Sequence, residues 1–268
     1  MAENILQIKD LTQQFKGVLA VDHIDMNLEK GRIYGLIGTN GAGKSTVVNM
    51  ISGNLFPTAG SISFEGKDVS HLDAAHRARM GIARTFQNLR LFGDQTVRDN
   101  VITASQITRK YTLFEMLAFL PRYRREEKEF QQRAQEALET MELAEYADLQ
   151  ADNLPYGLQR RLEIARCLAI RPKVLLLDEP AAGMNPQESL QLVEDIRGIH
   201  KDHPDMTILL IEHDMKVVMN LCEYIYVMAS GKMIAEGTPR QIYESEEVIS
   251  AYLGGTVRKN RRGSTEAE

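Results

Sequence analysis

Apolar and polar residues alternate near the start of the chain, and the pattern changes further on. Ile5–Phe15 and His23–Leu28 alternate with a period of two residues, which predicts two antiparallel strands. Residues 32–37 form a compact apolar strand, and a helix with apolar periodicity follows from about Ser45 to Ser52. Residues 57–64 predict a turn into a short exposed strand. The N-terminal region therefore combines several strands with one early helix.

The middle of the chain has the pattern of helices. From about residue 100 to 151, no segment predicts a strand. Arg125–Ala147 predicts an amphipathic helix whose apolar face consists of Phe130, Ala134, Ala137, Leu138 and Met141. Leu113–Leu120 is apolar with few charges, and we expect it to pack against the rest of this helical region rather than to contact lipid.

Strand patterns return after the helical region. Lys173–Leu177 and Thr207–Ile211 are apolar runs without alternation, as expected for central parallel strands that are covered on both faces. The helix-like stretch Gln187–His200 separates them, and Tyr224–Met228 predicts one more strand. The order of elements predicts an α/β fold that is interrupted by a helical region.

Composition excludes several classes of protein. The 268 residues are 43% hydrophobic, and 32 basic against 37 acidic side chains give a net charge of −5, which argues against a nucleic-acid partner. The apolar stretches are far shorter than the roughly 20 residues of a membrane span, and the start of the chain lacks the pattern of a signal peptide. Cys167 and Cys222 lie in apolar patterns, which predicts buried, reduced thiols.

A glycine-rich loop after the strand at 32–37 fits the pattern G-x-x-x-x-G-K-[ST] between a strand and a helix. Its glycines let backbone N–H groups point at phosphate oxygens, and the helix that follows adds its positive end. Lys44 supplies a charge to the terminal phosphates, and the Ser45 hydroxyl is suited to bind Mg²⁺. The loop comprises Gly38, Thr39, Asn40, Gly41, Ala42, Gly43, Lys44 and Ser45. It predicts a nucleoside triphosphate site.

The strand predicted at 173–177 ends in two adjacent carboxylates, Asp178 and Glu179. A carboxylate at the end of a buried strand can hold Mg²⁺ through its water shell, and we assign this role to Asp178. Glu179 is suited to orient or deprotonate a water that attacks the terminal phosphate. Asp-Glu-Pro after a strand is by itself a common loop start, but the phosphate loop favours the catalytic interpretation.

Further motifs resemble those of the ATP-binding subunits of ABC transporters, and the resemblance extends over residues 4–255. Gln87 stands where the family has the Q-loop glutamine, which senses Mg²⁺ and couples to the membrane subunits. His213 follows a strand, where the family has the switch histidine that contacts the γ-phosphate. Phe15, 23 residues before Gly38, stands where the family stacks an aromatic ring on adenine.

The segment Leu154–Arg161 resembles the family signature, usually Leu-Ser-Gly-Gly-Gln, which opens a helix that contacts the ATP of the opposite subunit. Gly157 is retained and permits close backbone approach, while Pro155 replaces the serine and Tyr156 replaces the first glycine. The hydroxyl contact is therefore missing, whereas the contribution of the helix end can survive. Asn185 stands where an aspartate is usual in the D-loop of the family.

The resemblance implies a P-loop NTPase (RecA-like) core with an N-terminal antiparallel β subdomain and an inserted α-helical subdomain. The ABC-type nucleotide-binding domain would span residues 1–255, with the helical subdomain inserted at about 92–165. Residues 256–268 are polar with several basic side chains, which favours a solvated, flexible tail over contact with anionic lipid headgroups.

The resemblance also implies ATP and Mg²⁺ as cofactors. ATP would bind from Gly38 to Thr46, with Phe15 against the base and Gly157 on the ATP of the opposite subunit. The remaining implied roles are Mg²⁺ binding by Ser45, Gln87 and Asp178, contact with the γ-phosphate by Gln87 and His213, and activation of water by Glu179.

Tyr156-Gly157 and the segment 159–166 are similar to the subgroup that serves branched-chain amino acid import, and so are residues 178–183, 212–215 and 251–254. The resemblance therefore implies the ATP-hydrolysing subunit of such an importer, peripheral at the cytoplasmic face of the inner membrane. Its implied partners are two transmembrane permease subunits, a second ABC ATPase subunit or a homodimer mate, and indirectly a substrate-binding protein.

Three alternatives share parts of this pattern. Transporters of urea, short amides or lipopolysaccharide differ only in cargo, which no residue of this chain would touch. A soluble ABC-type ATPase that acts on ribosomes or DNA would ordinarily have two cassettes, a long coiled coil or a basic surface. A GTPase or small-molecule kinase has the phosphate loop but not the combination of Gln87, Tyr156-Gly157 and His213, and the chain has no Asn-Lys-x-Asp guanine motif.

Overall fold

The computed structural model describes residues 3–87 and 89–251, and these residues form two compact units. Of the described residues, the first unit comprises 3–71 and 209–251, and the second comprises 72–87 and 89–208. The division passes through strand β8 (Thr207–Ile211), which is buried along its whole length. The predicted tail at 256–268 and most of the motif at 251–254 lie outside the described residues.

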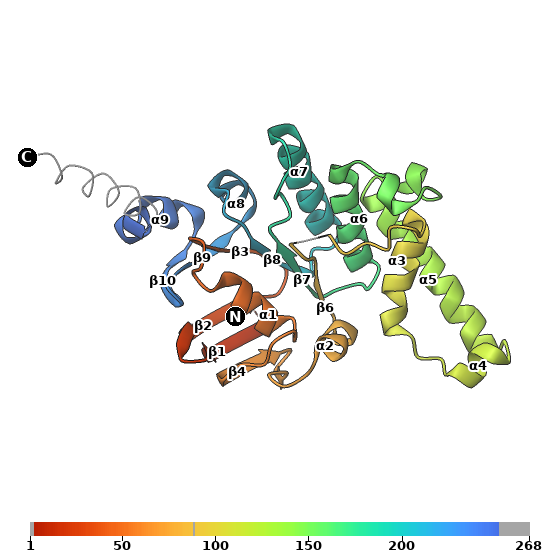
Figure 1. Cartoon of the computed structure of the whole chain (residues 1–268), viewed down its shortest axis with the longest axis horizontal. Coiled ribbons are helices and arrows are strands. Elements are labelled where there is room, and N and C mark those ends of the chain that lie inside the picture. The colour runs from red at the N-terminus through yellow and green to blue at the C-terminus, as the bar shows by residue number, and fades with distance from the viewer. Residues whose placement is uncertain (1–2, 88, 252–268) are drawn as a thin grey trace, which may run out of the picture. The chain divides into compact units, whose positions relative to one another are not determined.

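The first unit contains two sets of strands (Figure 1). In the four-stranded sheet the order is β2-β1-β4-β5, and β1 pairs antiparallel with both β2 and β4, as the alternating pattern predicts. In the second set, β3 pairs parallel with β9, and β9 pairs antiparallel with β10. The elements of this unit are β1 (Asn4–Phe15), β2 (Val18–Glu29), β3 (Ile33–Gly38), α1 (Lys44–Ile51), β4 (Ala59–Phe64), β5 (Lys67–Asp68), α8 (Met215–Leu221), β9 (Tyr224–Ala229), β10 (Lys232–Gly237) and α9 (Pro239–Glu244).

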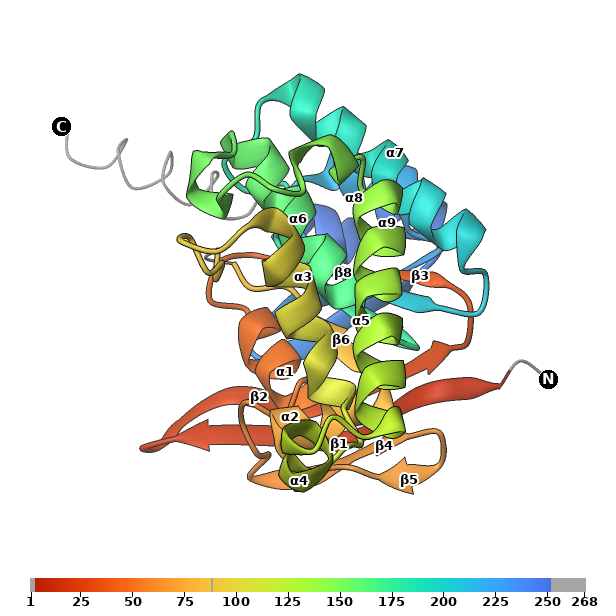
Figure 2. The same ribbon diagram turned by 90° about the vertical axis from the view of Figure 1, so that its right-hand side faces the viewer.

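The second unit is mostly helical, with β6 and β7 paired in parallel. Helices α3, α5 and α6 pack against one another (Figure 2), and Phe130, Ala134 and Leu138 of α5 are fully or almost fully buried. The elements are α2 (Ala74–Met80), β6 (Ile82–Arg84), α3 (Val97–Ser105), α4 (Leu113–Leu117), α5 (Pro121–Thr140), α6 (Tyr156–Leu168), β7 (Val174–Asp178) and α7 (Pro186–Asp202), with single 3₁₀ turns η1 (Gln106–Thr108), η2 (Ala144–Tyr146) and η3 (Ala151–Asn153).

The predicted bounds of the long amphipathic helix were wrong, although its buried face is confirmed. Helix α5 begins at Pro121, because proline is well tolerated in the first turn. It ends at Thr140, since Glu142 adopts left-handed backbone angles with φ 54°. The N–H of Leu143 then donates to the carbonyl of Leu138 at 2.7 Å, which completes a Schellman-type ending. The chain reaches this ending without glycine, so the sequence carries no stop signal there.

Two further expectations were wrong. The strand expected to be exposed at 57–64 is β4, which pairs with β1 and buries Ile62 and Phe64 completely. The apolar segment Leu113–Leu120 does not bury its large side chains, and Leu113 and Phe114 are 68% and 73% exposed.

By contrast, the central strands β3, β7 and β8 are buried at every position, as predicted. None of the described helices is both long enough and apolar enough to span a bilayer.

Candidate nucleotide site

The phosphate loop of the first unit joins β3 to α1 and is held by its own backbone. The Nζ of Lys44 donates to the carbonyls of Gly38 and Thr39, at 2.8 and 3.2 Å, and the side chain is buried. The loop turns through Gly41 and Gly43, with φ angles of 79° and 103°, which favour glycine. Gly43 is also the N-cap of α1 and carries no side-chain cap. The N-cap residue therefore offers no side-chain acceptor to the first helical turn, and a helix start of this kind can bind an anion.

Neighbouring strands enclose this loop so closely that two of its glycines have no room for a side chain. A Cβ at Gly38 would lie 2.2 Å from the carbonyl oxygen of Met228, and one at Gly43 would lie 2.6 Å from that of Ala20. The N–H of Gly231 also donates to the carbonyl of Ala42 at 3.0 Å. This hydrogen bond joins the turn between β9 and β10 to the phosphate loop and holds the loop in place. Ser45 and Asn40 remain exposed.

Phe15 and His213 lie in the same unit as the phosphate loop. Phe15 ends β1 at the tip of the β1–β2 hairpin, where it pairs with Val18 and is 45% exposed. His213 follows β8, and its N–H donates to the buried carboxylate of Glu212 at 3.2 Å. Asp214 then caps α8 by accepting from the N–H of Lys216. The backbone on both sides of His213 is thus fixed, while the imidazole is exposed.

The second unit places the two predicted carboxylates at the end of β7. Asp178 is buried, and its Oδ2 forms an ion pair with Arg84 Nη2 at 2.8 Å, while its N–H donates to Thr85 Oγ1 at 3.1 Å. Both partners lie at the end of the parallel neighbour β6. Glu179 follows with a left-handed backbone, φ 48°, which is unusual for a residue other than glycine.

Gln87 lies directly against Glu179. Its Nε2 donates to Glu179 Oε2 at 2.9 Å, so the amide holds one carboxylate oxygen. Gln87 and Glu179, which are 92 positions apart in the chain, are thus brought together.

The Tyr156–Arg160 pair at the start of α6 connects three loops of the second unit. The hydroxyl of Tyr156 donates to the carbonyl of Ala182 at 2.9 Å and accepts from Arg160 Nε at 3.1 Å. Arg160 also donates to the carbonyls of Phe86 and Gln87, at 3.0 and 2.6 Å. One tyrosine and one arginine therefore link the signature segment to the loop after β7 and to the Q-loop segment.

A buried carboxylate completes this cluster. Glu163 Oε1 accepts from the N–H of Phe86 at 2.9 Å, and Oε2 pairs with Arg160 Nη1 at 3.2 Å. Burial raises the pKa of the Glu163 carboxyl above its ordinary value, although the N–H of Phe86 and the guanidinium of Arg160 act in the opposite direction. The tight network keeps the Q-loop backbone in one position next to α6.

Known proteins match this chain over almost its full length. The family model described as "ABC transporter" matches residues 21–182, and the model described as "Branched-chain amino acid ATP-binding cassette transporter" matches residues 232–258. The chain is 45% identical to the high-affinity branched-chain amino acid transport ATP-binding protein LivG of Salmonella typhimurium, over 95% of this chain and 99% of that protein. The chain belongs to the ABC transporter family.

Two further relatives agree with this membership. This ABC protein is 43% identical to BraF of Pseudomonas aeruginosa, a high-affinity branched-chain amino acid transport ATP-binding protein, over 95% of this chain and 99% of that one. Among solved structures, the ADP conformation of MJ1267, an ATP-binding cassette of an ABC transporter, has a TM-score of 0.81 at 30% identity. The match covers 94% of this chain and 99% of that chain. The fold is that of the P-loop ATPases of ABC transporters, and ABC ATP-binding proteins are ATPases.

The oxygen donors of this ABC protein fit Mg²⁺. Ser45 offers an exposed hydroxyl, Gln87 an amide oxygen and Asp178 a carboxylate, all of them hard oxygen ligands. Across the described part of the chain, no three His, Cys, Asp or Glu side chains gather into a metal site. Taken one by one, the hydroxyl of the first unit and the amide and carboxylate oxygens of the second are of the kind that binds Mg²⁺ beside phosphates and water.

Several residues of this ABC protein escaped the sequence analysis. Arg84 and Thr85 hold Asp178, and Arg160 and Glu163 hold the Q-loop backbone. A signal for the second pair was present, because Arg160 and Glu163 are three residues apart on an otherwise apolar helix face and can pair there.

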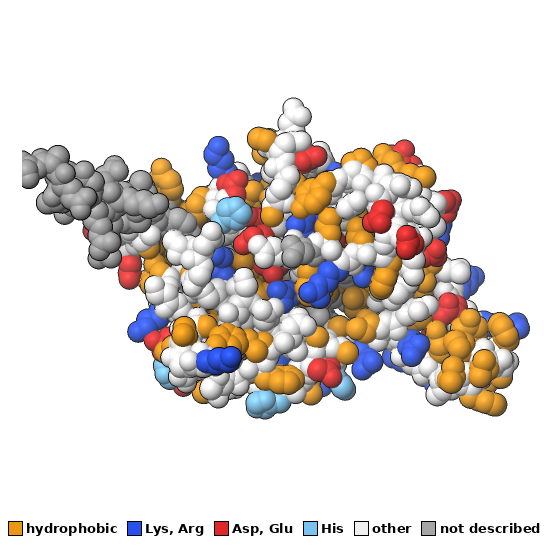
Figure 3. Space-filling view, viewed as in Figure 1, with side chains coloured by type: hydrophobic (Ala, Val, Ile, Leu, Met, Phe, Trp, Pro, Cys, Tyr) orange, Lys and Arg blue, Asp and Glu red, His pale blue; other side chains and the backbone are white. Residues whose placement is uncertain are grey.

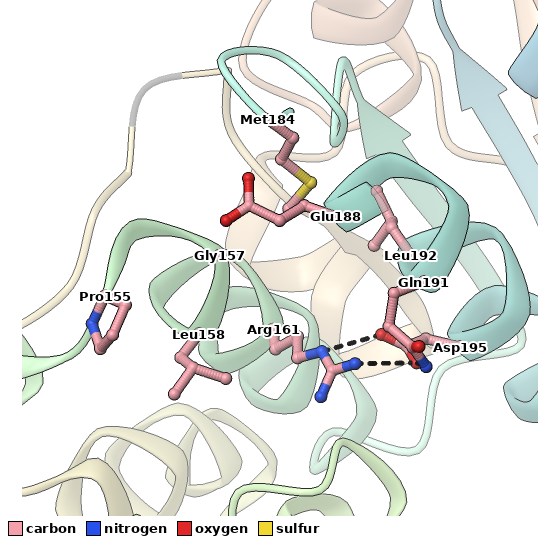
Figure 4. A pocket seen from close by; sticks show the side chains of 9 residues that line it. All are labelled: Pro155, Gly157, Leu158, Arg161, Met184, Glu188, Gln191, Leu192 and Asp195. Atoms are coloured by element: carbon pink, nitrogen blue, oxygen red, sulfur yellow. Dashed lines mark hydrogen bonds and ion pairs between the residues drawn. The ribbon is translucent and has the colours of Figure 1, made fainter. Parts of the chain in front are cut away.

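A cavity of about 260 Å³ lies between α6 and α7, and Gly157 is one of the residues that line it (Figure 4). Its lining includes the partly buried ion pair of Arg161 and Asp195, with 2.9 Å between Arg161 Nε and Asp195 Oδ2. Arg161 Nη2 also donates to Asp195 Oδ1 at 3.2 Å. Burial raises the pKa of the Asp195 carboxyl, and Arg161 opposes this rise. A Cβ at Gly157 would lie no closer than 3.4 Å to Glu188 Oε1, which is ordinary contact.

Asn185 caps α7 by accepting from the N–H groups of Gln187 and Glu188. The residue that departs from the family aspartate therefore has a capping role.

Proposed function

We propose that this chain is the ATP-hydrolysing subunit of an importer for branched-chain amino acids. The identity of 45% to LivG over 95% of the chain supports this cargo. The match at residues 232–258 to the branched-chain family model adds an independent segment.

The contact between Gln87 and Glu179 carries the proposal of hydrolysis, because it leaves one Glu179 oxygen with no hydrogen-bond partner among the described residues. That oxygen accepts a proton from the attacking water as the water approaches the γ-phosphate. Ser45, Gln87 and Asp178 would hold Mg²⁺, which would neutralise phosphate charge.

The remaining residues bind and orient ATP. The backbone of the loop from Gly38 to Thr46 and the ammonium of Lys44 bind the phosphates, and the exposed ring of Phe15 packs against adenine. The imidazole of His213 contacts the γ-phosphate, and the N-terminal turn of α6, at Gly157, contacts ATP held by a second ATPase subunit.

The second ATPase subunit is either a copy of this chain or a sister chain. Two transmembrane permease subunits complete the assembly at the cytoplasmic face of the inner membrane, with a substrate-binding protein on its other side. ATP closes the ATPase pair, and hydrolysis reopens it, so the difference in binding energy between the two states moves the permeases.

The variant Glu179→Gln tests the chemistry. We expect it to bind ATP like the wild type and to hydrolyse it about 10²–10⁴ times more slowly, because it lacks the proton acceptor. The exposed Glu246→Gln serves as the matched control. Wild-type turnover by Glu179→Gln would remove Glu179 from this role.

Capture from membranes tests the assembly and its cargo. Gentle detergent extraction and affinity capture should recover two polytopic membrane proteins and a second ATPase chain or copy, and deletion of this chain should abolish uptake of labelled leucine. Recovery of soluble proteins alone would overturn transport. Unchanged leucine uptake with permeases recovered would instead overturn only the cargo.

A further inference from the structure

The short helix α4 and the turn after it expose four large apolar side chains. Leu113, Phe114, Leu117 and Phe119, which we call the α4 patch, are 68%, 73%, 69% and 62% exposed. Figure 3 shows hydrophobic side chains gathered over the position that α4 occupies in Figure 1. Single exposed apolar residues are ordinary, but a group of four on one short segment marks an interaction site.

The segment that carries the patch is firmly held, so the apolar side chains are presented by a rigid support. The N–H groups of Lys110 and Tyr111 donate to the buried carboxylate of Glu126, at 2.8 and 3.3 Å. Thr112 and Glu115 form a capping box at the start of α4. The patch therefore does not arise from a loosely attached loop.

Aromatic packing fixes the other side of the segment. The ring of Tyr123 contacts those of Tyr111 and Phe119 edge to face, with centroids 5.1 and 5.9 Å apart. One side of Phe119 is thus anchored while most of its surface stays exposed. Phe119 therefore cannot turn inward without breaking its contact with Tyr123.

The charge around the patch is opposite to that of the chain. Residues 109–128 contain six basic and three acidic side chains, a net charge of +3, whereas the whole chain has −5. The basic residues are Arg109, Lys110, Arg122, Arg124, Arg125 and Lys128, all of them exposed.

The three acidic residues of this segment are engaged within it. Glu115 belongs to the capping box, Glu126 is buried, and Glu127 accepts from the hydroxyl of Tyr111 at 2.9 Å. Of the basic side chains, Arg122 pairs with Glu115 and Glu126. The exposed charged side chains of the segment that carries the patch are therefore mostly basic.

We propose that the α4 patch inserts into the interface of an anionic phospholipid membrane. Leucine and phenylalanine side chains surrounded by Arg and Lys are typical of segments that lie in this interface. The apolar side chains would enter the boundary between headgroups and acyl chains, and the long basic side chains would reach lipid phosphates. The inference needs neither a particular cargo nor ATP hydrolysis, so it stands or falls independently of the proposed function.

Fluorescence tests the proposal directly, because the chain contains no tryptophan. Phe114→Trp in the full chain provides a single emission from within the patch. Phosphatidylcholine vesicles that contain phosphatidylglycerol should shift this emission to the blue and carry the protein with them on flotation. Vesicles of phosphatidylcholine alone should do so much more weakly, and high salt should weaken the effect.

Variants in the Phe114→Trp background separate the patch from other surfaces. Leu113→Ser with Leu117→Ser should lower partitioning at least about tenfold. Arg124→Gln with Arg125→Gln should lower it about 25-fold, or about fivefold for each charge. Leu190→Ser on α7, which replaces a leucine that is 63% exposed, should change nothing. The basic residues near the C-terminus are common to all variants, so they cannot cause differences between them.

Equal partitioning of the patch variants and the Leu190→Ser control would overturn the proposal, and so would an unshifted emission. Loss of permease recovery from detergent extracts by the patch variants, without any effect on vesicles, would assign the patch to a protein partner and would also overturn it. ATPase activity of the patch variants serves as the check of folding and should match the wild type.

Discussion

The phosphate loop and the signature segment are both expected to contact ATP, yet they depend on glycine for different reasons. In the phosphate loop, backbone carbonyls of Met228 and Ala20 occupy the places where side chains at Gly38 and Gly43 would lie. In the signature segment, Gly157 faces only the end of a flexible glutamate side chain at an ordinary distance. Packing within the described chain therefore requires glycine in the first loop but not in the second.

The second loop is defined by side chains instead. Tyr156, which stands in place of a family glycine, and Arg160 hold the neighbouring loops by hydrogen bonds. A motif built from backbone geometry therefore tolerates few substitutions. A motif built on a helix end can exchange its side chains and gain new contacts.

Gly38→Ala tests whether packing requires glycine in the phosphate loop. The added Cβ would lie 2.2 Å from a backbone oxygen that cannot yield cheaply, so we expect a loss of about 3 kcal/mol or more in unfolding free energy and loss of ATP binding. Denaturant titration and a fluorescent ATP analogue measure both. Gly157→Ala is the matched control, and it should leave the unfolding free energy within about 1 kcal/mol of the wild type. Equal destabilisation of the two variants would contradict the comparison.

Arg160→Met tests the side-chain network of the second loop. It removes the donors to Phe86 and Gln87 and leaves the buried Glu163 without its cation, which should cost about 3–5 kcal/mol. We also expect a lower kcat, because the Q-loop backbone is released. Arg197→Met on the exposed face of α7 should change stability by less than about 0.5 kcal/mol. A stability of Arg160→Met close to that of Arg197→Met would show that the network contributes little.

Tyr156→Phe tests the contribution of a single hydroxyl in the signature segment. The lost bonds to Ala182 and Arg160 should lower the unfolding free energy by about 1 kcal/mol and lower kcat more than they change KM. Tyr243→Phe, at a tyrosine that is 75% exposed, provides the control. Identical kinetics of the two variants would exclude a positioning role for the Tyr156 hydroxyl.

We expect the smallest effect on stability from the two buried thiols, one of which lies in each unit. Burial raises the pKa of Cys167 on α6 to about 12 and also raises the pKa of Cys222. Below pH 9 both thiols are neutral in the folded and unfolded chains, and their contribution to stability is complete. Above pH 9 only the unfolded chain ionises, so the unfolding free energy should fall with rising pH.

Cys167→Ala should reduce this alkaline slope by roughly 1 kcal/mol per pH unit. Native iodoacetamide labelling of both thiols should be slow at pH 8, and rapid labelling of Cys222 alone would indicate that the first unit opens by itself. An unchanged slope in Cys167→Ala would show that its thiol ionises normally in the fold.

Sequence patterns predicted the fold and the local motifs better than the contacts that hold them. The buried strands β3, β7 and β8 and the phosphate loop follow from local pattern, and the ABC transporter family was predicted from motifs. The end of α5 could not be predicted, because a glutamate takes the left-handed position that glycine usually marks. The partners of Asp178 and Gln87 were also missed, since Arg84 and Arg160 lie 94 and 73 positions away and only tertiary structure joins them.

The left-handed backbone at Glu179 has a consequence for variation at this position. A non-glycine residue with φ 48° stores strain of about 1 kcal/mol or more, which glycine would relieve. Stability and hydrolysis therefore make opposite demands on position 179. A chain selected only for resistance to heat should drift towards glycine there, and retention of glutamate by an active chain indicates selection for turnover.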